Sequence, residues 1–207
     1  MKTKFIAIEG GEGSGKSSVL KAVLKELKDF PVVVTREPGG SPYGEVIREI
    51  ALKHELAKQA SSETMLCLMF ASRFDHCQNK IKPLLESGTT VISDRFDASS
   101  YAYNVWAQSG GKLEELFWAL RKELSILPDL YIYFSVDVRE GLRRAHSRNL
   151  LTSDGNHFDD RKVDFHEKIK EGYEKFFLLV PHVIIDANQP FDIVKADLLK
   201  VLNGELV

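Results

Sequence analysis

Short apolar runs alternate along this chain with longer segments in which apolar residues recur with helical spacing. Five runs rich in β-branched and aromatic residues are predicted as strands, at 4–9, 32–35, 90–93, 130–136 and 183–186. Helical periodicity predicts helices at 16–28, about 43–53, 61–87, about 98–127 in two pieces, 139–148, 160–179 and 190–202. The alternation predicts an α/β fold with a parallel sheet, and the nearly continuous apolar strands predict helices on both of its faces.

Composition narrows the class of protein. The 207 residues fit one domain, and 43% hydrophobic with 28% charged residues exclude disorder and a disulfide scaffold. With 28 basic against 30 acidic residues, the net charge of -2 indicates no overall attraction to nucleic acid or to a membrane surface. Two cysteines and the lack of a long apolar run favour a reducing, cytoplasmic setting without a membrane span. We therefore expect small-molecule partners.

The segment after the first predicted strand has the spacing of a phosphate-binding loop. Residues 10–17, GGEGSGKS, match G-x-x-x-x-G-K-[ST] between a predicted strand and a predicted helix. In such a loop, backbone N–H groups surround phosphate oxygens, Lys16 would reach the β and γ phosphates, and the Ser17 hydroxyl would bind Mg²⁺. The sequence therefore predicts a nucleoside triphosphate site made of Gly10, Gly11, Glu12, Gly13, Ser14, Gly15, Lys16, Ser17 and Ser18.

Guanidinium groups follow two of the predicted strands at their carboxyl ends, where α/β sheets bind ligands. Arg36 lies in the segment TREPGG (35–40), Arg95 follows Asp94 after the third strand, and Arg73 lies in a predicted helix. Each arginine alone would commonly form an ordinary ion pair. Beside a phosphate loop, they predict a second anion held opposite the triphosphate.

Three segments together resemble the thymidylate kinase family, whose members phosphorylate dTMP to dTDP: FIAIEGGEGSGKS at 5–17, TREPGG at 35–40 and DRFDASSYAY at 94–103. The resemblance extends from about residue 4 to residue 186. It implies a single P-loop kinase domain over 1–207 in a three-layer sandwich with a five-stranded parallel sheet. It also implies a lid at about 145–160, ATP as donor with Mg²⁺, and a homodimer.

The resemblance implies a role for each matching residue. Arg36 and Arg95 would hold the acceptor phosphate, Asp94 would organise the magnesium ion with Ser17, and Lys16, Arg95 and Asp94 would be catalytic. Two further carboxylates, Glu9 and Asp159, are candidate metal ligands, although Glu9 is equally compatible with a capping role. The other expected dTMP contacts are Glu12 with the 3′-hydroxyl, Arg73 with a thymine carbonyl, Ser99 and Ser100 beside the base, and Tyr103 against the 2′ position.

Some positions depart from the family pattern. The base-stacking phenylalanine is expected four residues before Arg73, where Met69 stands, while Phe70 stands three before, so either side chain is a candidate. Gly13 fills a place where one branch of the family carries an arginine. The cation that stabilises the transferred group is then expected from the lid, with Arg148 as first and Arg144 as second candidate.

Two other classes of protein share the phosphate loop. A deoxynucleoside kinase phosphorylates a neutral hydroxyl and needs a carboxylate base, so Arg36 and Arg95 argue against it. A regulatory GTPase would need N-K-x-D, but residues 79–82, NKIK, lack the aspartate. The polar stretch 149–159 fits a lid or an ordinary surface loop on composition alone.

Overall fold

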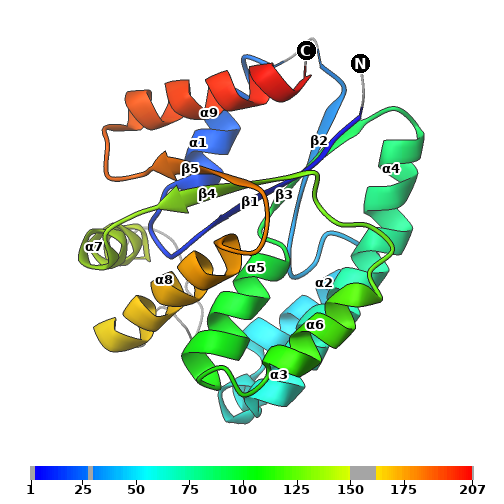
Figure 1. Ribbon diagram of the computed structural model, residues 1–207, viewed down its shortest axis with the longest axis vertical. Helices are drawn as coiled ribbons and strands as arrows, with labels where there is room; N and C mark the ends of the chain where they lie inside the picture. Colours follow the sequence, from blue (N-terminus) through cyan, green and yellow to red (C-terminus); the bar gives the residue numbers. More distant parts are fainter. Residues whose placement is uncertain (1–2, 28–29, 150–161, 207) are drawn as a thin grey trace.

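The computed structural model describes residues 3–27, 30–149 and 162–206, without the side chains of residues 148 and 149. Five parallel strands form a sheet in the order β2-β3-β1-β4-β5 (Figure 1). The prediction of a five-stranded parallel sheet is therefore confirmed. The strands are β1 (Phe5–Gly10), β2 (Val32–Arg36), β3 (Thr90–Asp94), β4 (Leu130–Ser135) and β5 (His182–Asp186).

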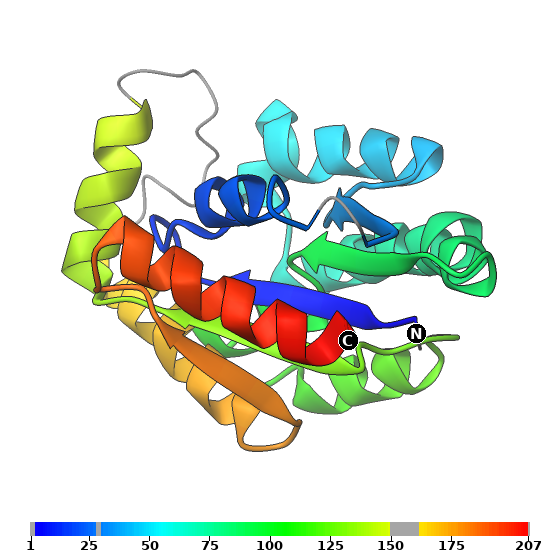
Figure 2. The same cartoon turned by 90° about the horizontal axis from the view of Figure 1, so that it is seen from above.

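Helices cover both faces of the sheet, which confirms the three layers. One face carries α1 (Lys16–Val23) and α9 (Phe191–Leu206), and the views in Figures 1 and 2 agree on this arrangement. The other face carries α3 (Ser62–His76), α5 (Asp97–Ser100), η4 (Tyr101–Gln108), α6 (Glu114–Lys122) and α8 (Val163–Phe177). The remaining described helices are α2 (Pro42–Arg48), η1 (Glu49–Lys53), η2 (Glu55–Gln59), η3 (Cys77–Ile81), α4 (Lys82–Glu86) and α7 (Val138–Asn149).

The two cores follow from the alternation of side chains along each strand. Phe5 and Ala7 of β1 pack towards α3, η4 and α8, whereas Ile6 and Ile8 pack towards α1 and α9. All six residues of β1 are buried because this strand lies at the centre of the sheet. The near-continuous apolar character of the strand is thus explained by burial on both faces.

Most helix bounds agree with the sequence pattern, with two differences. The predicted helix at 61–87 runs through α3, η3 and α4, beginning after Ser61, whose hydroxyl accepts a hydrogen bond from Thr64 N at 3.1 Å. In contrast, α1 ends at Val23 rather than near residue 28, and η2 was not predicted. Among the described helices, none is long and apolar enough to cross a membrane.

The strand register brings the candidate residues to one edge of the sheet. Asp94 of β3 pairs with Ile8 of β1 on one side and with Arg36 of β2 on the other. The phosphate loop begins at Gly10, two residues beyond Ile8. Because these strands are parallel, their carboxyl ends place the loop, Asp94 and Arg36 side by side.

Candidate active site

The loop between β1 and α1 has the backbone that a phosphate cradle needs. Gly10, Gly13 and Gly15 all have positive φ, at 150°, 66° and 82°, a region that glycine enters without steric cost. At Gly13 there is also no room, because a Cβ would lie 1.8 Å from the carbonyl oxygen of Gly141 at the start of α7. The loop therefore packs directly against α7, backbone on backbone.

Lys16 is buried inside this loop. Its Nζ donates to the carbonyls of Gly10 at 2.8 Å and Gly11 at 3.1 Å, and to Ser14 Oγ at 3.0 Å. Burial, followed by the positive charge of Arg95, lowers the pKa of Lys16 to about 8. The ammonium group is thus held where phosphate oxygens would meet the loop.

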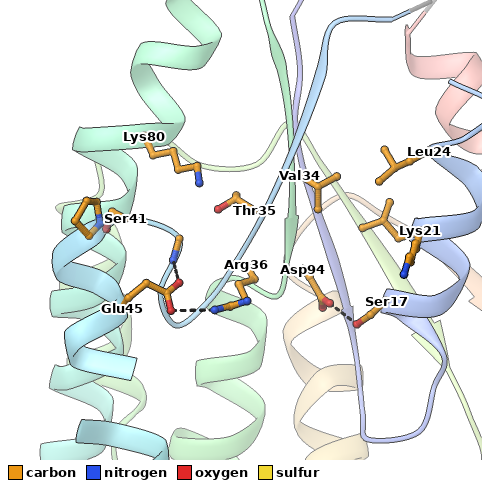
Figure 3. A pocket seen from close by; sticks show the side chains of 13 residues that line it. Ser17, Lys21, Leu24, Val34, Thr35, Arg36, Ser41, Glu45, Lys80 and Asp94 are labelled. Carbon is orange, nitrogen blue, oxygen red and sulfur yellow. Dashed lines mark hydrogen bonds and ion pairs between the residues drawn. The ribbon is translucent and has the colours of Figure 1, made fainter. Parts of the chain in front are cut away.

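Ser17 and Asp94 form the candidate Mg²⁺ site. Ser17 Oγ donates to Asp94 Oδ2 at 2.6 Å across the gap between α1 and β3, as Figure 3 shows. A hydroxyl and a carboxylate suit Mg²⁺, which usually takes few protein ligands and completes its shell with phosphate oxygens and water. Within the described residues, no group of three or more His, Cys, Asp or Glu could hold a metal ion.

Arg95 is the most heavily anchored residue of the site. It is a non-glycine residue in the left-handed region, with φ 71°, and its N–H donates to Ile8 O at 2.9 Å. Its Nη1 lies 3.1 Å from Gly10 O, 3.1 Å from Ser99 Oγ and 3.0 Å from Tyr173 Oη. Such strain persists only where surrounding contacts fix the residue, and it clusters at functional sites.

Glu12 and Tyr103 meet beside this guanidinium. Glu12 Oε1 accepts from Arg95 Nη2 at 2.9 Å and from Tyr103 Oη at 3.1 Å. The Tyr103 ring lies 5.3 Å from the Arg95 guanidinium carbon. The third residue of the phosphate loop is thereby joined to Arg95, expected at the acceptor phosphate, and to Tyr103, expected at the acceptor sugar.

Glu9 occupies a different place from the one expected of a metal ligand. It is fully buried, and Oε1 accepts from the backbone N–H of Phe96 at 2.7 Å and of Ser99 at 3.3 Å. Its Oε2 accepts from Ser99 Oγ at 2.6 Å and Tyr173 Oη at 3.4 Å. Burial raises the pKa of Glu9 to about 7. Because both oxygens face protein donors, the capping role describes Glu9 better than the metal role.

The acceptor side contains an arginine that sequence reasoning missed. Arg36 Nη2 pairs with Glu45 Oε2 at 2.9 Å, as drawn in Figure 3, and Arg48 Nη1 donates to Pro38 O at 2.8 Å. Burial, together with the positive charges of Arg36 and Arg95, lowers the pKa of Arg48. Arg48 is therefore tied to the TREPGG segment that also carries Arg36. The signal for Arg48 is its position in the predicted helix that follows TREPGG.

Arg73 is nearly fully buried, with 2% exposure. Its Nε donates to Glu37 Oε2 at 2.8 Å, and its Nη2 donates to Phe96 O and Ser100 Oγ, both at 3.0 Å. Its Nη1 is buried without a hydrogen-bond partner. Since a buried donor is rarely left unmatched, this nitrogen marks a place for a ligand acceptor.

Of the two candidates for base stacking, Phe70 belongs to this region. Its ring lies 4.7 Å from the Arg73 guanidinium carbon and it packs in the same core as Phe96. Met69 packs instead with the separate cluster around Ala51, Ala57 and Met65. The structure thus brings Phe70, and not Met69, to Arg73.

The predicted lid residues are only partly described. Arg144 Nε donates to Glu140 Oε1, and its Nη1 donates to Ala187 O, both at 2.7 Å. The Arg148 side chain lies outside the described residues, as do Asp159 and most of the segment 145–160. Ser18 lies exposed in the first turn of α1, after Ser17.

A cavity of about 660 Å³ opens beside the Ser17–Asp94 pair. Its walls come from α1, β2 and the start of α2, and Figure 3 shows Val34 and Thr35 pointing to opposite sides of β2. Arg36 and Glu45 also line it. The hollow reaches both the candidate metal site and Arg36, so it belongs to the same site.

Known proteins resemble the chain over nearly its whole length. The family model described as thymidylate kinase matches residues 8–198. The protein named thymidylate kinase from Halalkalibacterium halodurans is 40% identical over 98% of this chain and 97% of its own length. Those of the same name from Hahella chejuensis and Chlamydia caviae are 37% and 39% identical, over 99% and 91% of this chain and 98% and 91% of theirs.

Proposed function

The chain belongs to the thymidylate kinase family, and on that premise we propose how its site transfers the γ-phosphate of ATP to dTMP to give dTDP. The expectation drawn from the phosphate loop, TREPGG and the DRF segment is confirmed at the level of family and reaction. The roles of individual residues, the metal, the oligomeric state and the location are the parts proposed here.

The observation that carries the proposal is the placement of Arg36 and Arg95 beside Asp94, next to a phosphate loop. Arg36 pairs in register with Asp94, Arg95 follows Asp94 directly, and Arg95 Nη1 lies 3.1 Å from Gly10 O of the loop. Guanidinium groups bind phosphate through two N–H donors at once. A monophosphate is the acceptor that these arginines favour, because its charged oxygens can bind guanidinium groups, whereas the neutral hydroxyl of a nucleoside offers them no charge.

We propose that the chain contributes positioning and positive charge to the transfer. Lys16 and the loop N–H groups hold the donor phosphates, and Arg95 lies between the loop and the acceptor. Phosphoryl transfer needs little covalent chemistry from the protein. The attacking oxygen of dTMP is already anionic, so the mechanism assigns no general base.

Ser17 and Asp94 would hold Mg²⁺ together with its phosphate ligands. When bound, the ion would neutralise charge on the donor phosphates. The protein's own part is to fix a hydroxyl and a carboxylate 2.6 Å apart at the first turn of α1 and the end of β3.

The nucleoside of dTMP is recognised in this proposal by buried polar atoms. The unpartnered Nη1 of Arg73 donates to a thymine carbonyl, with Phe70 beside the ring and Ser99 and Ser100 near the base. Glu12 accepts from the 3′-hydroxyl, and Tyr103, held against Glu12, occupies the space of a ribose 2′-hydroxyl.

We also propose that the protein is a cytoplasmic homodimer in which each chain forms one kinase domain. The described cysteines, Cys67 and Cys77, are both free thiols, which fits a reducing compartment. Tyr43, Val46 and Ile50 are exposed at helical spacing along α2 and η1, which supplies an apolar stripe for a second copy. Light scattering of the protein and of a Val46→Lys variant tests this part.

Steady-state kinetics test the acceptor cluster. Arg36→Ala and Arg48→Ala should each raise the KM for dTMP at least about tenfold, because a charged hydrogen bond contributes about 1.5–3 kcal/mol. The KM for ATP should stay within about twofold. Lys53→Ala removes an exposed cation five residues after Arg48 and serves as control. Equal losses for ATP and dTMP would show that these arginines only support the fold.

A further inference from the structure

From Thr35 near the end of β2 to Ser41, every second residue is hydrogen-bonded to α3. Thr35 Oγ1 lies 2.8 Å from His76 Nε2, and Gly39 N donates to Ser72 Oγ at 3.0 Å. The Ser41 hydroxyl donates to Asp75. Between these contacts, Glu37 pairs with the base-reading candidate, Arg73. The segment proposed to bind the acceptor phosphate thus packs directly on α3, the helix that carries Arg73.

Glu37 is the centre of this contact and is itself 4% exposed. Its Oε2 accepts from Arg73 Nε at 2.8 Å, while its Oε1 lies 2.9 Å from His76 Nδ1. His76 is fully buried. A carboxylate bound on one oxygen only could rotate about its last bond, but one bound on both oxygens cannot turn without losing a buried hydrogen bond.

The hydrogen-bond partners of His76 indicate which ring nitrogen is the donor and which is the acceptor. Glu37 offers only acceptor oxygens, so Nδ1 is the donor in that contact. In the neutral imidazole, Nε2 then accepts, and the Thr35 hydroxyl is its donor at 2.8 Å. Thr35 therefore fixes the ring, the ring fixes Glu37, and Glu37 fixes the guanidinium of Arg73.

Gly40 leaves the space that this chain of contacts needs. Its φ is +83°, and a Cβ there would lie 2.4 Å from His76 Nε2 and 2.5 Å from Thr35 Oγ1. Any side chain at this position would push the two atoms apart. The second glycine of TREPGG thus packs against the Thr35–His76 hydrogen bond itself.

We infer that His76 is a positioning residue for base recognition: it locks Glu37, and Glu37 aims the unpartnered Nη1 of Arg73 at the thymine carbonyl. The inference rests on the proposed function, in which Arg73 reads the base. Neither Glu37 nor His76 touches the substrate in this arrangement. Their effect passes entirely through the direction of one guanidinium group.

Two competitive inhibitors separate base reading from phosphate reading. Thymidine carries the base without the phosphate, and 2-deoxyribose 5-phosphate carries the phosphate without the base. His76→Leu, which keeps the volume of the side chain but removes both hydrogen bonds, should raise the inhibition constant of thymidine about tenfold. The constant for 2-deoxyribose 5-phosphate should change less than twofold, and so should the KM for ATP.

A conservative variant and a matched control complete the test. His76→Asn places an amide N–H near the position of Nδ1, so it should restore thymidine inhibition to within about threefold of the original protein. Cys77→Ala shortens the buried side chain that directly follows His76 in the sequence, and it should leave both inhibition constants unchanged. Should His76→Leu fail to fold, Thr35→Val replaces it, with an expected rise of about threefold for thymidine alone.

The outcomes distinguish the inference from its premise. One outcome is that Arg73→Lys weakens inhibition by thymidine while His76→Leu, or Thr35→Val in its place, leaves that inhibition unchanged. In that case Arg73 reads the base, and His76 has no positioning role. Equal weakening of both inhibitors by His76→Leu also overturns the inference, because it indicates a general distortion of the site. If Arg73→Lys leaves thymidine inhibition unchanged, base recognition by Arg73 is wrong and the role of His76 falls with it.

Discussion

The hydroxyl of Tyr173 lies 3.0 Å from Nη1 of Arg95, so a side chain of α8 holds a guanidinium group that also contacts the phosphate loop at Gly10 O. The same hydroxyl lies 2.8 Å from Ser99 Oγ and 3.2 Å from Gly10 O. A residue near the end of the chain thereby connects the end of β1, the turn after β3 and α8.

Tyr173→Phe should lower kcat/KM for dTMP about tenfold, since it removes one neutral partner from a charged donor. The KM for ATP should remain within about twofold. Steady-state kinetics with each substrate varied in turn measure both values. Tyr133→Phe is the matched control, because that ring lies 5.3 Å from the Tyr173 ring and is equally buried in the core. Similar losses in both variants would mean that core packing, not the Arg95 contact, is responsible.

Glu9 should make stability depend on pH. Its pKa is 4.5 in the unfolded chain and about 7 in the fold, so the folded state retains a proton that the unfolded state has released. Glu9 therefore makes its whole contribution to the unfolding free energy below pH 4.5. This contribution, roughly 3 kcal/mol at most, is lost as pH rises through 7. Glu9→Gln removes this dependence.

Urea unfolding of the original protein and of Glu9→Gln, repeated between pH 5.5 and 8, measures the difference. As pH rises, the unfolding free energy of Glu9→Gln should increase relative to that of the original protein. A constant difference across this range would show that Glu9 ionises normally in the folded protein.

Lys16 should couple ATP binding to proton uptake. Its pKa of about 8 in the free protein means that it is partly neutral above pH 8, whereas bound phosphates favour its charged form. ATP affinity should be constant below pH 7.5 and fall by up to about tenfold per unit well above pH 8. Calorimetry at pH 8.5 in two buffers of different ionisation enthalpy detects the uptake. Identical binding enthalpies in the two buffers would contradict it.

The proposed lid cation can be separated from its neighbour by comparing two variants. Arg148→Ala should lower kcat about a hundredfold with little change in dTMP binding, the pattern of a contact made in the transition state. Arg144→Ala should mainly lower the melting temperature, because Arg144 binds Glu140 and the carbonyl of Ala187. If Arg144→Ala loses the hundredfold instead, the catalytic cation is Arg144.

Local pattern was enough for the fold and for much of the site. Strands with apolar residues on both faces predicted the covered parallel sheet, and the spacing from Gly10 to Ser17 predicted the loop. The acceptor arginines Arg36 and Arg95 follow strands, so the parallel register alone brings them to one edge.

Residues whose roles depend on tertiary contacts were not predictable in the same way. Tyr173 and His76 lie on helices far from Arg95 and Glu37 in sequence, and no local motif marks them. Glu9 looked like a carboxylate at a strand end. It is buried because β1 lies at the centre of the sheet, and the backbone N–H groups of Phe96 and Ser99 both bind its Oε1.

The contact between Gly13 and Gly141 has a consequence for how such an enzyme can evolve. A Cβ at Gly13 would lie 1.8 Å from the Gly141 oxygen, and one at Gly141 would lie 2.5 Å from the Glu12 oxygen. A substitution at either position is therefore tolerated only after the other region has moved, which makes the two sites epistatic. An arginine at Gly13 would collide with the backbone of α7, so a single Gly13→Arg mutation could not replace the proposed lid cation by a cation in the loop.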